Sequence, residues 1–260
     1  MHPVFMSLLL IVAGADKPVA RPDAGTVKAG SVDWQEQVLK ATGSGAPDMR
    51  SLSPAQARLG AENAAKLDAL RNLLAQVKGI HITADKTVGE AMAQDAVKGR
   101  VEGVVKGYRI VKKRYYSDQG VEMDVEVPLA GIAQAVTGPS EGPPASDPSR
   151  PGGSRATGVV IDARGLGLQP ALAPRLLDES GKVLYSADSL SDATRKESAP
   201  ARYFKTLELA SKAAPMGTSP LLIKASKAKG SDLVLGAAEA RQLADLPPVV
   251  LAEGRVGIVP

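Results

Sequence analysis

The stretch SLSPAQARLGAENAAKLDALRNLLAQVKG, residues 51–79, decides how the first half of the chain folds. Ser53 and Gln56 occupy the first and last positions of a capping box, and Pro54 stands at the favoured first helical position. Apolar residues then recur at spacings of three and four beside a row of small residues: Leu67, Leu70, Leu74 and Val77, with Ala61, Ala65 and Ala69. Gly79 follows the last periodic residue, where a left-handed C-cap is expected. We predict a helix over 54–78 that buries the leucine row.

A charged hairpin is predicted downstream of this helix. Residues 121–129 alternate apolar with acidic side chains, which is typical of a half-buried strand with an acidic outer face. The preceding stretch YRIVKKRYY, residues 108–116, is basic, and SDQG between the two suits a tight turn. Cations and tyrosines together could form a platform for single-stranded nucleic acid. We expect instead that the opposing acidic strand neutralises them, so no nucleic-acid partner is predicted.

The N-terminal part of the chain predicts export. Residues 4–13 form an apolar run too short to span a bilayer, and Ala13-Gly14-Ala15 has the small-x-small pattern of a signal-peptidase site. The initial Met-His-Pro lacks the usual positive charge of a signal peptide. Residues 1–15 are therefore expected to be a signal peptide, and residues 16–52, rich in Gly, Pro, Ser and Ala, a flexible tether.

Composition divides the rest of the chain into two modules. Residues 137–156 hold five prolines and four glycines without an apolar pattern, which predicts a linker. On either side, residues 53–136 and 157–260 mix strand and helix patterns. The expected fold class is α+β, with two small α+β modules joined by a Pro/Gly-rich linker.

The composition excludes several chemistries. The chain has no cysteine, which removes thiol catalysis, disulfides, cysteine-bound zinc and acylation at a lipobox cysteine. It has two histidines, and His81 alternates with apolar neighbours in a way that turns it away from the core. Thirty-two basic residues against 28 acidic ones give a net charge of +4, too small to indicate a nucleic-acid binder. The sequence assigns no catalytic, cofactor-binding or metal-ligating residue.

One segment nevertheless has the look of an active site. In GVVIDARGLGLQPALAPRLLDESGKVLY, residues 158–185, an apolar run ends at Asp162 and Arg164, and Gly165 and Gly167 follow. A dinucleotide fingerprint would need a third glycine where Pro170 stands. A zinc amidase would need histidines, and none follows His81. We expect Asp162 and Arg164 to pair at the end of a strand while the two glycines allow a bend.

The first module resembles a known group of envelope proteins. The features are the Ala-rich helix entering LDALRNLLAQVKGI, then TADKTV, then a hairpin running from G-Y-x-I-V to V-x-M-x-V-x-V-P. Over residues 53–136 they resemble the N-terminal domain of flagellar assembly protein T and the small outer-membrane lipoproteins related to flagellar protein P. The resemblance implies a small α+β module that builds or supports rings around motility and secretion machines, and it carries over no catalytic residue. The missing lipobox cysteine departs from the lipoprotein pattern.

Two functions are compatible with these features. The first is a non-catalytic, exported structural or assembly protein of the bacterial envelope. It would act in the periplasm through contacts with envelope or flagellar-type proteins or with further copies of itself, with peripheral outer-membrane association compatible with this role. The alternative is an exported cell-wall-acting enzyme or ligand-binding protein that uses residues 158–185. The residues singled out for structure are Ser53, Gly79, Asp162, Arg164, Gly165 and Gly167.

Export can be tested on the mature protein. Intact-mass spectrometry of protein from an export-competent host should place the N-terminus near Asp16, because the small residues Ala13 and Ala15 fit the signal-peptidase site. Recovery of intact Met1 from the periplasmic fraction would contradict this expectation.

Overall fold

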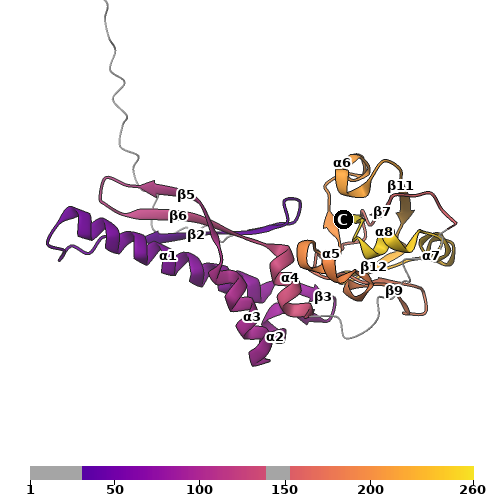
Figure 1. Ribbon diagram of the computed structural model, residues 1–260, viewed down its shortest axis with the longest axis horizontal. Helices are drawn as coiled ribbons and strands as arrows, with labels where there is room; N and C mark the ends of the chain where they lie inside the picture. The colour runs from indigo at the N-terminus through magenta and orange to yellow at the C-terminus, as the bar shows by residue number, and fades with distance from the viewer. Residues whose placement is uncertain (1–30, 139–152) are drawn as a thin grey trace, which may run out of the picture.

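A computed structural model describes residues 31–138 and 153–260 (Figure 1). Within these residues the chain is α+β, as expected, and it has a separate main hydrophobic core for each half. The predicted signal peptide and most of the predicted linker lie outside the described residues. No helix in the described part of the chain is both long and apolar enough to cross a membrane.

The first domain is an antiparallel sheet with the long helix α1 packed along it (Figure 1). The strand order is β1-β2-β6-β5, and a small β3-β4 hairpin follows α1. The strands are β1 (Ser31–Asp33), β2 (Val38–Gly45), β3 (His81–Thr83), β4 (Lys86–Thr87), β5 (Arg109–Tyr115) and β6 (Val121–Pro128). The helices are α1 (Pro54–Gly79), α2 (Val88–Ala91), α3 (Asp95–Lys106) and α4 (Leu129–Thr137).

Helix α1 begins where the sequence predicts and ends differently. The Ser53 hydroxyl accepts a hydrogen bond from the Gln56 amide at 3.3 Å, which confirms Ser53 as the N-cap. Gly79 is the last residue of the helix and does not adopt the left-handed conformation, so the C-cap prediction is wrong. The chain instead passes through Ile80, which is buried and extended with φ −73°, directly into β3. An extended exit needs no residue with positive φ.

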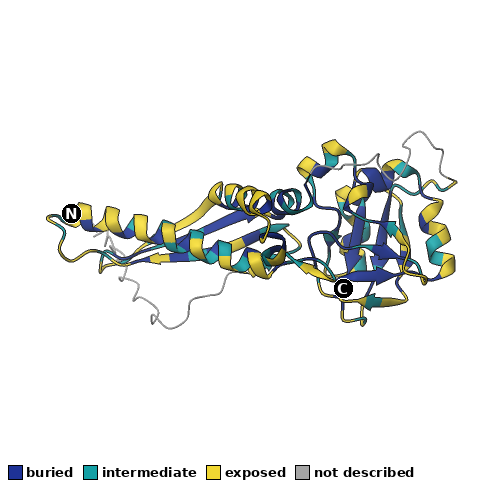
Figure 2. Cartoon of the chain, turned by 90° about the horizontal axis from the view of Figure 1, so that it is seen from below, coloured by how far each residue is buried: buried dark blue, intermediate teal, exposed yellow. Residues whose placement is uncertain are grey.

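The buried face of α1 is rotated from the predicted one. Leu67 is 63% exposed, and Leu70 and Leu74 are only partly buried. The buried residues share a spacing of four and are mostly small: Ala57, Ala61, Ala65, Ala69, Leu73 and Val77. Figure 2 shows the exposed outer side of the helix along its whole length. The alanines form the contact row because the opposing strand comes too close for leucine.

That opposing strand lies within the stretch predicted to be a flexible tether, and the prediction is wrong for residues 31–45. Strand β2 pairs with β6 over eight residues, from Val38 opposite Pro128 to Gly45 opposite Val121. A Cβ on Gly43 would lie 2.2 Å from the Ala65 carbonyl oxygen, and one on Gly45 would lie 1.9 Å from the Ala61 carbonyl oxygen. By composition these two glycines indicate a flexible chain. In the structure they allow β2 to contact α1, because they have no Cβ.

The predicted hairpin is confirmed as β5 and β6. The basic strand pairs with the acidic one from Arg109 opposite Glu126 to Tyr115 opposite Val121, with a shift of register at Val111. Strand β6 forms the middle of the sheet, and its apolar residues are buried against α1 and β2.

The second domain has a parallel sheet at its centre. The order is β10-β14-β7-β11, and a second sheet has the order β12-β13-β8-β9. The strands are β7 (Gly158–Asp162), β8 (Leu176–Leu177), β9 (Val183–Tyr185), β10 (Arg202–Tyr203), β11 (Pro220–Lys224), β12 (Lys227–Lys229), β13 (Asp232–Val234) and β14 (Val256–Val259). The helices are α5 (Asp192–Glu197), α6 (Leu207–Lys212), α7 (Ala237–Ala244) and α8 (Pro248–Ala252), with 3-10 turns η1 (Ala187–Ser189) and η2 (Ala214–Met216).

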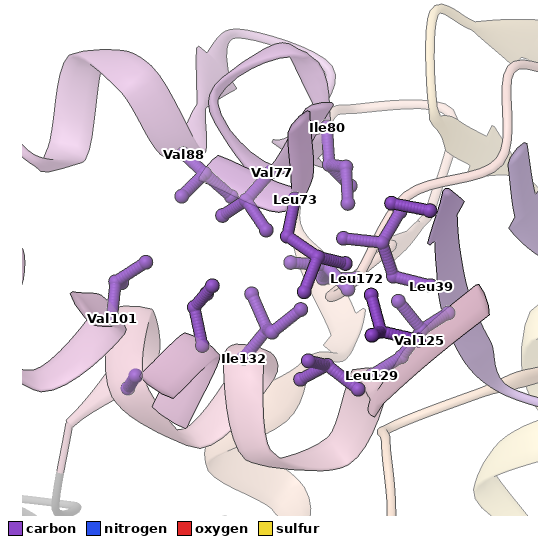
Figure 3. Close-up of a cluster of buried hydrophobic side chains, with 14 of the residues drawn as sticks. Leu39, Leu73, Val77, Ile80, Val88, Val101, Val125, Leu129, Ile132 and Leu172 are labelled. Atoms are coloured by element: carbon purple, nitrogen blue, oxygen red, sulfur yellow. The ribbon is translucent and has the colours of Figure 1, made fainter. Parts of the chain in front are cut away.

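The two domains share an interface built from the segment after β7. Leu172 is fully buried in the first-domain core, beside Leu39 and Leu73 (Figure 3). The Leu172 and Ala173 amides donate to the His81 and Ile82 carbonyls at 2.9 and 2.8 Å, so this segment pairs with β3. The rings of Trp34 and Tyr203 meet edge to face across the interface, with centroids 5.3 Å apart.

The rotated helix face gives a direct stability test. Leu73→Ala should lower the free energy of unfolding by about 2–5 kcal/mol, because it leaves a cavity in the first core. Leu67→Ala, the matched change on the exposed face, should cost less than about 0.5 kcal/mol. Chemical denaturation of both variants measures the difference. Equal losses would mean that the buried face has been misplaced.

Candidate functional site

The segment with the look of an active site lies at the carboxyl end of the central parallel strand. Strand β7 is flanked by β14 and β11, and its first four residues are fully buried. Asp162 is the last residue of this strand, and the chain then turns through Gly165 and Gly167. Both glycines have positive φ, 76° and 68°, which only glycine adopts without strain. The predicted bend is therefore present.

Asp162 and Arg164 form the pair expected at this turn. The Arg164 guanidinium donates from Nε to Oδ1 at 2.8 Å and from Nη2 to Oδ2 at 2.9 Å. The Arg164 backbone amide also donates to Oδ1, at 3.2 Å. Arg164, and to a smaller extent Lys224 on β11, holds the pKa of Asp162 below its ordinary value. The carboxylate therefore stays ionised at neutral pH and keeps its hydrogen bonds to Arg164.

This geometry favours a structural role over a catalytic one. Both oxygens of Asp162 accept from the Arg164 side chain and Oδ1 also accepts from the Arg164 amide, so the carboxylate holds the turn that follows the strand. His81, the histidine in the described chain, lies on β3, and its own carbonyl is used at the domain interface. Among residues 31–138 and 153–260, no group of three His, Asp or Glu side chains is placed to hold a metal ion.

A more exposed feature is the edge strand β5. It ends the first sheet and pairs with β6 on one side. Val111 is 58% exposed and Tyr115 is 50% exposed, and six of its seven residues are classed as exposed. An edge strand presents backbone N–H and C=O groups that an extended segment of another chain can pair with.

The cations on β5 are held by acidic neighbours. Arg114 donates to Glu122 at 3.0 Å and to Asp124 at 2.8 Å, and Arg109 pairs with Glu126. Lys113 reaches across to Glu62 on α1 at 3.0 Å, and this contact lowers the pKa of Glu62. The expectation that the opposing acidic strand pairs with these cations is confirmed for Arg109 and Arg114, whereas Lys113 pairs with the helix instead. These ion pairs hold β5 against β6 and α1, while the apolar side chains of Ile110 and Val111 are exposed to solvent.

The second half of the chain resembles a known protein domain. A model of the second domain of Treponema pallidum Tp0624 matches residues 158–260. None of the curated proteins matches the chain. The matched part contains the parallel sheet and the Asp162 turn, and it is less than half of the chain. The second half of this protein is therefore similar to the second domain of that Treponema protein.

The structural role of Asp162 makes a prediction with a defined pH dependence. Asp162→Ala should lower the free energy of unfolding by about 1 kcal/mol at neutral pH, since Arg164 is largely exposed to solvent. Because the folded-state pKa of Asp162 is lowered, the pair stabilises the protein above pH 3.8. That contribution is lost as the pH falls through the lowered pKa, so variant and wild type should converge in acid.

Arg164→Met and the double variant complete the test. The double variant should lose little more than either single change, because both remove the same pair. Turnover of peptidoglycan by the wild type that disappears in Asp162→Asn at unchanged melting temperature would support the catalytic alternative instead.

Proposed function

We propose that this protein is an exported, non-catalytic structural or assembly protein of the bacterial envelope that acts through protein contacts. The observation that carries the proposal is the exposed edge of β5, a seven-residue strand with solvent-facing apolar side chains on a firmly packed sheet. Acidic neighbours bind Arg109, Lys113 and Arg114 of this strand, so the strand is held in shape before any partner binds. A pre-formed edge binds an extended segment with little loss of conformational entropy.

The arrangement of the two domains supports a role in assembly. The first domain places its hairpin at a distance from the second domain, as Figure 1 shows, while the domain interface is built by backbone hydrogen bonds and buried side chains. Such a chain can present one surface at each end of a single body. The match to a second domain of another protein is consistent with a module that is combined with different first domains.

The partners we propose are envelope proteins, and the place is the periplasm. The signal-like N-terminus and the resemblance of residues 53–136 to flagellar assembly protein T support this assignment. The resemblance is also the basis on which we propose a role in a flagellar ring or in another motility or secretion ring. Self-association and peripheral outer-membrane contact are compatible with it.

Site-specific photo-crosslinking in the native host tests the proposal. A benzophenone side chain at position 111 of β5 should crosslink to a defined envelope protein. The same group at Val183, which is 46% exposed on the three-residue edge strand β9, should not. Crosslinks only to cytoplasmic proteins, or equal products from both positions, would contradict the proposal.

A substitution tests whether the edge is required. Val111→Asp should abolish the crosslinked complex, formed then through a probe at Tyr115, and should leave the melting temperature close to wild type because the side chain is exposed. Val183→Asp is the matched control and should leave the complex intact. A complex that survives Val111→Asp would place the contact elsewhere.

A further inference from the structure

A groove of about 660 Å³ runs between the two domains, away from the β5 edge. Helices α3 and α4 of the first domain form one wall, and α5 of the second domain, which contacts α4, forms the other. A volume of this size is typical of a site for a small molecule. Its position makes it depend on both domains.

Arg195 on α5 is buried in the lining of this groove. The residue is 5% exposed, and none of its three guanidinium nitrogens has a hydrogen-bond partner among the described residues. The nearest carboxylate oxygen in its ion pair, Oδ1 of Asp188, lies 3.6 Å from Nη1, beyond hydrogen-bond distance, and the Asp188 side chain is 78% exposed. A buried guanidinium carries five N–H donors, and leaving them unmatched destabilises the fold. Proteins rarely keep such a group without a use for it.

The other charges of the groove reinforce this cation. Arg100 on α3 and Lys196 on α5 also line it, against one carboxylate, Asp192. The Arg100 Nε donates to the Ala135 carbonyl at 2.9 Å, which fixes the side chain along the α3–α4 wall. Asp188, which pairs with Arg195, adds a second carboxylate beside the lining, so three cations against two carboxylates leave one net positive charge. The electrostatic field in the groove therefore favours an anion.

The remaining wall is apolar and open. Val104 and Ala135 contribute hydrocarbon surface, and Gly103 faces unoccupied space, since a Cβ built there meets no atom within 4 Å. An inorganic anion alone would leave this apolar surface exposed to water. A molecule with an apolar body would bury it while its head group meets Arg195.

We propose that the groove binds a small amphipathic anion, a phosphate or carboxylate group on an apolar body, with Arg195 as the buried anchor. The guanidinium nitrogens are covered from solvent in this structure, so the side chain must turn toward the groove to reach the ligand. Once turned, the planar guanidinium matches both head groups, because it donates two parallel hydrogen bonds to their oxygens. The ligand would contact α3, α4 and α5 together and so tie the two domains to each other. This site is independent of the β5 edge, and either can fail without the other.

Titration calorimetry of the full chain with octyl phosphate and octanoate, both kept monomeric, tests the proposal. At least one of them should bind saturably with one site per chain, and the stronger of the two identifies the head group. Inorganic phosphate should bind at least tenfold more weakly, and neutral octanol should not bind. Absence of saturable binding by both anions would overturn the proposal, and phosphate binding as tightly as octyl phosphate would overturn the apolar part of it.

Arg195→Met separates a binding role from a structural one. Methionine fills a similar volume without the buried N–H donors that lack partners, so the variant should melt at a higher temperature than wild type in anion-free buffer and should lose binding. A lower melting temperature would show that the arginine serves the fold, and wild-type binding would show that it does not anchor the ligand. Either result would overturn the assignment.

A second variant tests the groove without touching its charges. Gly103→Leu should block binding by filling the space, and it should not unfold the helix because the position is open and leucine is a better helix former. Gly99→Leu, one turn earlier in α3 and also open, gives the same gain in helix propensity outside the lining and should bind as wild type. Unchanged binding by Gly103→Leu would overturn the location.

Discussion

The first domain depends on the contact between the alanine row of α1 and the glycines of β2. Side chains no larger than a methyl group line the helix at Ala61, Ala65 and Ala69, and Gly43 and Gly45 oppose them. The contact leaves no space for a Cβ on either glycine, so helix and strand are at their closest approach. With β2 held there, β6 pairs along its whole length, and the hairpin that carries the β5 edge follows from that pairing. The exposed strand is thus positioned by a contact between the smallest side chains in the protein.

The sequence predicts the parts of this fold that are local. The Ser53 cap, the basic and acidic strands of the hairpin, the buried strand β7 and the bend at Gly165 and Gly167 each depend on a few neighbouring residues. The role of residues 31–45 is not local. Gly, Thr and Ser in VLKATGSG indicate a flexible chain by composition. They make a strand only because a row of alanines from the following helix, Ala61, Ala65 and Ala69, fits against them. The predicted burial of the leucine row is wrong for the same non-local reason. Hydrophobicity alone favours leucine over alanine as the buried face, but the close approach of β2 admits only alanine there.

The candidate sites divide in the same way. The pairing of Asp162 with Arg164 joins residues two apart and could be predicted from the strand end. The burial of Arg195 could not, because a charged residue on a six-residue helix is expected to face solvent, and α3 and α4 of the other domain enclose its surroundings. The domain interface is equally non-local: Leu172 leaves the second domain to enter the first core, and Arg175 donates to Asp232 in its own domain and to Asp85 in the other. Within the segment 158–185, Leu172 and Arg175 join the two halves, and the groove beside Arg195 exists because they are joined.

Hydrogen exchange of the full chain, read at residues 38–45, tests the central contact most directly. If the alanine row of α1 holds β2 in the sheet, the amides of β2 that donate to β6 should exchange as slowly as those of β6 itself. Exchange at the rate of an unstructured chain across residues 38–45, with β6 still protected, would mean that this stretch is the tether its composition indicates. The position of the β5 hairpin would then need another explanation.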